Sequence, residues 1–231
     1  YKQRAVAYFA SERPMEALRD LKTAFDLNPK DGSTVGWIPA PEVAACPNQE
    51  FKEGMLQFAT DAIEKNPAAR SHRAVLALHL GRLDIAREDL AEIINSKGNQ
   101  ATHYDLYQVA MLHLADNRNV EAYRAACREM AGRFVDSKDA DALAFMGWVC
   151  ARMPDTLEVY APVLSAVQRA SDATPDRSDL RRTLGALQYR DKQFEAALKT
   201  LQPFGITGDT PVDPKTSHAY PLFFLSMTQH R

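Results

Sequence analysis

Apolar residues recur along most of the chain at intervals of three and four positions, the spacing that places them on one face of an α-helix. Prolines and glycines interrupt this pattern and mark the turns between helices. The pattern predicts an all-α protein with helices at about residues 1–11, 14–27, 50–65, 69–80, 83–96, 102–115, 119–134, 139–151, 157–172, 178–190, 193–203 and 218–231.

Pairs of small residues twelve positions apart repeat along the chain. A small residue is expected wherever two helix backbones approach closely, because a large side chain would hold them apart. The second members Ala86, Ala122 and Ala197 are therefore predicted to be buried where helices touch. The first members lie 69, 36 and 75 residues apart, near two, one and two periods of the roughly 34-residue tetratricopeptide repeat. The pairs are Ala5 and Ala17, Ala74 and Ala86, Ala110 and Ala122, and Gly185 and Ala197.

The repeats predict a single tetratricopeptide-like, right-handed superhelical solenoid of about six helix pairs over residues 1–231, because one pair alone cannot bury its apolar face. A proline-rich insertion, residues 28–49, is predicted to fold back and seat Trp37 against neighbouring helices. Both ends look like partial helix pairs, so we expect a longer parent protein. We expect N-terminal repeats at 1–67, two regular repeats at 68–135, two repeats at 136–204, a loop at 205–216 and the first helix of an incomplete repeat at 217–231.

Residues 101–231 carry a more specific set of motifs. They are Tyr123-Arg124 with Ala126-Cys127, Trp148 with Cys150 and Pro154, and the closing Phe224-Leu225 with His230-Arg231. In this order the motifs resemble the C-terminal helical-repeat region of planctomycete-type bacterial multidomain proteins. In those proteins the region commonly follows a serine/threonine kinase domain or a WD-repeat propeller. The resemblance implies an accessory interaction region of a larger bacterial protein, and it carries no kinase activity onto this part of the chain.

Charge and cysteine content narrow the function classes. The formal net charge is −2 and the basic residues are scattered, so we expect no nucleic-acid partner. The three cysteines Cys46, Cys127 and Cys150 are not closely spaced, which fits a reducing compartment better than a disulfide or zinc framework. No apolar run approaches the ~20 residues of a membrane span. We expect a cytoplasmic protein without direct membrane insertion, whose parent could be membrane-anchored.

Motifs of known catalytic chemistry do not occur in the sequence. It has no glycine-rich nucleotide loop, no HExxH and no GxSxG, and the kinase signatures HRD and DFG are missing. His72 and His79 share a helix face seven residues apart, but no carboxylate or cysteine completes a metal set. We therefore predict a non-catalytic protein with no cofactor and no metal.

A partner-binding surface is expected on the first helices of the pairs, which line the concave face of tetratricopeptide arrays. Tyrosine and arginine are enriched among residues that dominate binding energy. The alternative interpretation is that the aromatic residues pack between neighbouring helices. The candidate partner-binding residues are His79, Tyr104, Tyr107, Met111, Arg182, Tyr189, Arg190, Phe223 and His230.

The sequence thus favours a protein–protein interaction module that binds a peptide or a partner helix. A second hypothesis is a self-associating scaffold, with homo- or hetero-oligomers formed through the C-terminal end. There we predict an exposed apolar patch at residues 222–227. An all-helical enzyme with an unrecognised site is the third hypothesis.

Overall fold

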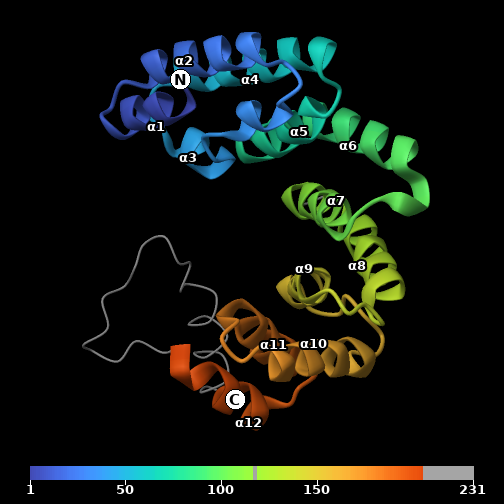
Figure 1. Cartoon of the computed structure of the whole chain (residues 1–231). Helices are drawn as coiled ribbons and strands as arrows, with labels where there is room; N and C mark the ends of the chain where they lie inside the picture. The colour runs from blue at the N-terminus through green and yellow to red at the C-terminus, as the bar shows by residue number, and fades with distance from the viewer. Residues whose placement is uncertain (117–118, 205–231) are drawn as a thin grey trace. The chain divides into compact units, whose positions relative to one another are not determined.

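The computed structural model describes residues 1–116 and 119–204 (Figure 1). The described residues form helices and no strand, so the all-α prediction is confirmed. The predicted helix at 218–231 and the predicted patch at 222–227 lie outside them. The α-helices are α1 (Lys2–Ala10), α2 (Pro14–Leu27), α3 (Ala40–Ala45), α4 (Gln49–Lys65), α5 (Ala69–His79), α6 (Leu83–Lys97), α7 (His103–Ala115), α8 (Val120–Phe134), α9 (Ala140–Arg152), α10 (Ala161–Ala173), α11 (Ser178–Arg190) and α12 (Phe194–Leu201), and the 3-10 helices are η1 (Gly32–Gly36), η2 (Gly98–Gln100) and η3 (Gln202–Phe204).

Most observed helices begin and end within two residues of the predicted bounds, but two do not. Helix α10 begins at Ala161 rather than at residue 157, because the chain before it caps α9. There the Thr156 hydroxyl donates to the Cys150 carbonyl at 2.6 Å, and Asp155 adopts a positive φ of 54°. Helix α3 was not expected among the prolines, although proline is well tolerated in the first turn of a helix, where its missing N–H leaves no bond unmade.

Contacts between helices group the chain into two compact units. Unit 1 comprises Tyr1–Ala101 and Met111–Asn117, and unit 2 comprises Thr102–Ala110 and Arg118–Arg231. Helix α7 therefore contributes residues to both units. The continuous solenoid over residues 1–231 stays a prediction.

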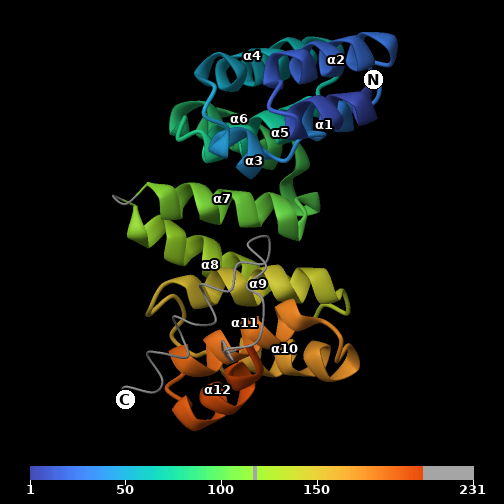
Figure 2. The same cartoon turned by 90° about the vertical axis from the view of Figure 1, so that its left-hand side faces the viewer.

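Unit 1 is built from helix pairs that pack on one another. Helix α1 packs on α2 and α5 on α6, while α2 packs on α4 and α4 on α5 (Figures 1 and 2). The small residues Ala5, Ala17, Ala74 and Ala86 are completely buried at these contacts, which confirms the prediction for Ala86.

The proline-rich segment packs against unit 1 as predicted, through η1 and α3. Element η1 contacts α2, α4 and α5, and α3 contacts α4 and α5. Trp37 is half-buried, and the Lys2 ammonium lies 4.5 Å from the centre of its ring. The deeper apolar positions belong to Val35, Ile38 and Val43, which are 0–3% exposed. This segment thus replaces a regular first helix with two short ones.

Unit 2 continues the same style of packing. Helix α8 contacts α9, α9 contacts α10 and α11, and α11 contacts α10 and α12. Ala197 is completely buried, as predicted, and Gly185 lies so close to Leu201 that an added Cβ would approach its Cγ to 2.5 Å. The prediction for Ala122 is wrong, since this residue is only half-buried. Its neighbour Tyr123 is completely buried instead, because the Tyr123 hydroxyl donates to the Val149 carbonyl at 2.5 Å.

Among the described residues, three of the helix pairs are joined by the same tight turn. The seventh residue after the first small residue of the pair has a left-handed backbone, and the next N–H bonds back to the carbonyl five positions earlier, as in a Schellman motif. The left-handed residues are Glu12 (φ 58°), Gly81 (φ 72°) and Lys192 (φ 62°). The bonds run from Arg13 to Tyr8 (2.9 Å), from Arg82 to Ala77 (2.8 Å) and from Gln193 to Gln188 (2.9 Å).

Two helix pairs of unit 1 each contain an ion pair between their two helices. Arg4 on α1 donates two hydrogen bonds, of 2.6 and 2.8 Å, to the carboxylate of Asp20 on α2. Arg73 on α5 grips Asp89 on α6 in the same way, at 2.8 and 2.7 Å. Both pairs are sixteen residues apart, and each arginine directly precedes the first small residue of its helix pair. The ion pair is therefore a repeated element that fastens the two helices together.

Candidate partner-binding surface

The first turn of α7 is fixed by a reciprocal cap. The Thr102 N–H and hydroxyl both donate to Asp105 Oδ2 at 2.8 Å, and the Asp105 N–H donates to the Thr102 hydroxyl at 3.2 Å. This arrangement is a capping box, in which the side chains satisfy N–H groups that the helix start leaves without partners. The cap holds the side chains of the first two turns of α7 in place, among them two of the predicted tyrosines.

Four rings from α7 and α9 gather in unit 2 and form what we call the aromatic surface: His103, Tyr104, Tyr107 and Phe145. The Phe145 ring is the centre, with ring-centroid distances of 4.9 Å to Tyr107, 5.4 Å to His103 and 5.8 Å to Tyr104. Tyr104 and Tyr107 also stack on each other at 6.2 Å. The rings therefore form one continuous platform.

The aromatic surface is accessible to solvent rather than enclosed. Tyr104 is 43% exposed, and the side chains of His103, Tyr107 and Phe145 are half-buried. Partial burial raises the pKa of the Tyr104 hydroxyl above its ordinary value of about 10, so this group stays neutral at physiological pH. A neutral hydroxyl beside an apolar ring offers a partner both apolar area and a hydrogen bond.

Charged groups border the aromatic surface at the start of α9. Asp139 caps this helix by accepting the Asp141 N–H at 2.9 Å, and its other carboxylate oxygen lies 3.8 Å from His103 Nδ1. The Asp141 carboxylate pairs with Arg177 at 2.8 Å, and Arg177 also pairs with Asp179 at 2.6 Å. This network links the starts of α9 and α11 and sets a polar border beside the rings.

Phe145 was not among the sequence-predicted residues, although it is central to the surface. Tyr104 and Tyr107 could be assigned from their offset to the small residue Ala110. The unit that contains α9 has a longer turn and no matching pair of small residues, so the same counting gave no residue there. An apolar ring at a half-exposed position of a first helix is the signal that identifies it.

Two predicted residues on α11 make contacts within unit 2. Tyr189 is 8% exposed and packs on Phe194, with ring centroids 5.4 Å apart. Arg190 donates to the carbonyls of Ala151 at 2.7 Å and Arg152 at 3.2 Å, which lie at the end of α9. Burial lowers the pKa of the Arg190 guanidinium. The packing alternative, which the sequence left open for the aromatic residues, fits Tyr189.

Three further predicted residues are found on α5, α7 and α11. Arg182 on α11 is half-buried and donates to the Ser178 carbonyl at 3.3 Å. His79 is exposed and Met111 is half-buried, and both belong to unit 1. Phe223 and His230 lie outside the described residues.

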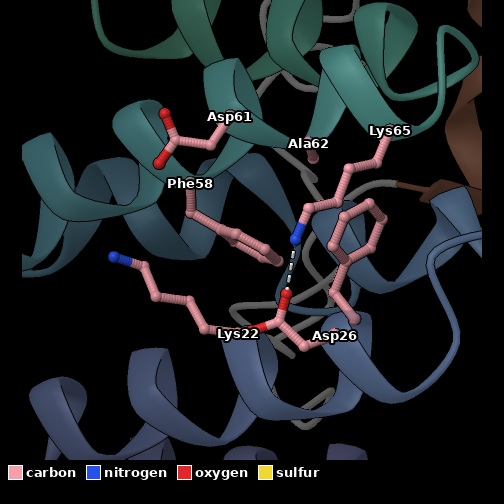
Figure 3. Close-up of a pocket in the computed structure, with 7 residues that line it drawn as sticks. Lys22, Asp26, Phe58, Asp61, Ala62 and Lys65 are labelled. Carbon is pink, nitrogen blue, oxygen red and sulfur yellow. Dashed lines mark hydrogen bonds and ion pairs between the residues drawn. The ribbon is translucent and has the colours of Figure 1, made fainter.

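Unit 1 contains a hollow of about 220 Å³ between α2 and α4 (Figure 3). Its floor is the edge-to-face pair Phe25 and Phe58, whose ring centroids lie 5.7 Å apart. Asp26 and Lys65 form an ion pair of 2.8 Å across it, and Lys22 and Asp61 stand at its rim. Because charges of both signs line so small a space, this hollow favours no particular ligand.

Among the described residues, no cluster of three or more histidine, cysteine or acidic side chains could hold a metal ion. None of the helices described is long and apolar enough to cross a membrane. No protein-family model matches the chain, and no curated protein matches it.

Proposed function

We propose that this chain is a non-catalytic helical-repeat module that binds a peptide or a partner helix on the aromatic surface. The observation that carries the proposal is the gathering of three half-exposed or exposed aromatic side chains, Tyr104, Tyr107 and Phe145, from two different helices. Aromatic groups that are already ordered by packing lose little conformational entropy on binding, so their contact area contributes efficiently to affinity.

The helix pairs are, in this proposal, about six tetratricopeptide-like repeats. The recurring left-handed turn and the recurring ion pair support a repeat, because both occur at fixed offsets from the small residues. The packing of alternate helices, α2 on α4, α3 on α5 and α9 on α11, is also what stacked pairs produce. The module would serve as the accessory region of a larger bacterial multidomain protein.

The test begins by selecting peptides that bind the immobilised full chain from a random peptide library. The dissociation constant of a selected peptide is then measured for the wild type and for Tyr104→Ala, which changes an exposed side chain with little risk to folding. Loss of an aromatic ring that contacts the partner typically weakens binding by ~10-fold or more. Val159→Ala is the matched control, because Val159 is an exposed apolar residue of unit 2, 65% accessible and outside the aromatic surface.

We expect Tyr104→Ala to weaken peptide binding and Val159→Ala to leave it unchanged. Equal affinity of the wild type and Tyr104→Ala for every selected peptide would move the binding site elsewhere. Of the two alternatives, neither the scaffold nor the helical enzyme is favoured by an observation on the described residues. Light scattering across a range of concentrations tests the scaffold, which requires association.

A further inference from the structure

A second hollow, of about 380 Å³, lies in unit 2 and shares no residue with the aromatic surface. Three buried side chains form its floor: Ser171, Leu184 and Gln188, which are 4–8% exposed. The Gln188 Oε1 atom is buried without a hydrogen-bond partner among the described residues. The hollow is lined by Gln168, Ser171 and Asp172 of α10, Arg181, Leu184 and Gln188 of α11, and Ala196, Lys199 and Thr200 of α12.

The rim of the hollow carries an excess of positive charge. Within the described chain neither Arg181 nor Lys199 forms an ion pair, and Arg181 lies 5.6 Å from the ring centre of Phe204. The only carboxylate in the lining, that of Asp172, accepts a hydrogen bond from the Gln168 amide at 2.8 Å. Two cations therefore meet one carboxylate that is already engaged.

The equivalent place in unit 1 shows what this hollow lacks. The helix pairs α5–α6 and α11–α12 share their turn, so positions can be counted from Ala74 and from Gly185. Four residues before these lie Arg70 and Arg181, and fourteen before them lie the hydroxyls of Thr60 and Ser171. An arginine and a hydroxyl side chain are thus present in both places.

The carboxylate is present in unit 1 alone. Asp89 stands fifteen residues after Ala74 and is completely buried, where it meets Arg73 at 2.7 Å and Arg70 at 3.4 Å. The corresponding residue of α12 is Thr200, and Leu184 replaces Arg73. Thr200 and Leu184 both line the hollow. The arginine is therefore present in both helix pairs, as Arg70 and as Arg181. The carboxylate that Arg70 contacts has no equivalent beside Arg181.

We propose that the hollow binds a small organic carboxylate, whose carboxyl group stands where the Asp89 carboxylate stands in unit 1. Arg181 and Lys199 pair with this carboxylate, and an N–H or O–H of the ligand donates to the Gln188 amide oxygen. Leu184 and Ala196 contact its apolar part. A volume of about 380 Å³ lies within the range of small-molecule sites.

The first experiment titrates the full chain by calorimetry with L-glutamate, O-phosphoserine and inorganic phosphate, with glycerol as an uncharged control. We expect saturable binding of L-glutamate that weakens as salt is raised, because the pairing is electrostatic. Stronger binding of inorganic phosphate than of either amino acid would assign the hollow to phosphate and overturn the proposal. The absence of saturation by every carboxylate up to about 20 mM would also overturn it.

The second experiment uses variants. Thr200→Asp supplies an internal carboxylate to Arg181, so we expect it to abolish glutamate binding and to raise the melting temperature. Thr200→Asn, a neutral residue of the same size as aspartate, should raise the melting temperature less. Gln188→Leu removes the amide oxygen that has no partner, and it should weaken binding by ~10-fold or more without lowering the melting temperature.

Lys138→Gln is the control for charge, since Lys138 is an exposed cation of unit 2 outside the hollow. It should bind glutamate like the wild type. If Thr200→Asp and Arg181→Gln both bind like the wild type, the carboxylate is bound elsewhere and the proposal fails. Peptide binding at the aromatic surface is measured separately, so failure here leaves the proposed function standing.

Discussion

The helix pair α5–α6 of unit 1 and the helix pair α11–α12 of unit 2 have the same turn but fill their polar interior differently. In α5–α6, Arg70 and Arg73 surround the buried Asp89. In α11–α12 the positions of Arg73 and Asp89 hold Leu184 and Thr200, and a hollow remains beside Arg181. The backbone of this helix pair therefore does not require an internal ion pair. The same position holds a buried ion pair in one helix pair and borders a hollow in the other.

The largest expected effect comes from breaking the ion pair of α5–α6. Asp89→Asn keeps the size of the side chain but leaves Arg70 and Arg73 without their carboxylate. Removing one partner of a buried ion pair is strongly destabilising, and we expect a loss of about 3 kcal/mol in the free energy of unfolding. Urea unfolding monitored by circular dichroism measures it.

Asp84→Asn is the control for this change, because Asp84 lies on the same helix and is exposed. It should alter stability by less than about 0.5 kcal/mol. If Asp89→Asn were equally mild, the ion pair of unit 1 would not be what holds this helix pair together, and the contrast with α11–α12 would lose its meaning.

The sequence allowed the helices to be predicted because their apolar faces repeat with the helical period over ten or more residues. Helix α3 was not predicted, because Pro39 and Pro41 indicate a break in a helical pattern. Proline is nevertheless tolerated at the start of a helix. On α8 the buried residue is Tyr123, whereas the spacing predicts Ala122. A large residue can be buried there because its hydroxyl donates a hydrogen bond to the Val149 carbonyl. Spacing alone does not reveal such a bond.

The candidate sites were only partly open to prediction. Tyr104 and Tyr107 followed from their distance to Ala110, whereas Phe145 needed the contact between α7 and α9. The Arg–Asp pairs could have been found, since residues 4–6 and 73–75 both read Arg-Ala-Val and an Asp-Leu follows sixteen residues after each arginine. The hollow could not, because it depends on which side chains are absent at an equivalent position.

A smaller effect is expected at the shared turn, where the two helix pairs use different residues. Gly81 has φ 72° and Lys192 has φ 62°, so the lysine occupies a backbone region that favours glycine. We expect Gly81→Ala to lower the free energy of unfolding by about 1 kcal/mol. We expect Lys192→Gly to raise it by at least a few tenths of a kcal/mol. Nothing lies within 4 Å of a Cβ added at Gly81, so any loss reports the backbone and not a clash. Thermal unfolding of both variants measures the difference, and effects of the same sign would show that the two turns are not equivalent.

The smallest effect is expected at the ion pair between Arg4 and Asp20, and it is tested by lowering the pH. Hydrogen bonds from Arg4 hold the pKa of Asp20 below its ordinary value, against the opposing effect of burial. A lowered pKa in the folded state means that the pair stabilises the protein above the unfolded pKa of about 3.9, and that this contribution is lost as the pH falls through the folded value. The Arg4 side chain is 57% exposed, so water and salt screen this pair more than the pair at Asp89.

We therefore expect Arg4→Gln to lower the urea midpoint slightly at pH 6, and to have progressively less effect as the pH is lowered toward about 2. A difference between the wild type and Arg4→Gln that stayed constant over this range would mean that the arginine acts by packing against Tyr1 and Tyr8, whose ring centres lie 5.1 and 5.7 Å from its guanidinium carbon, and not by its charge.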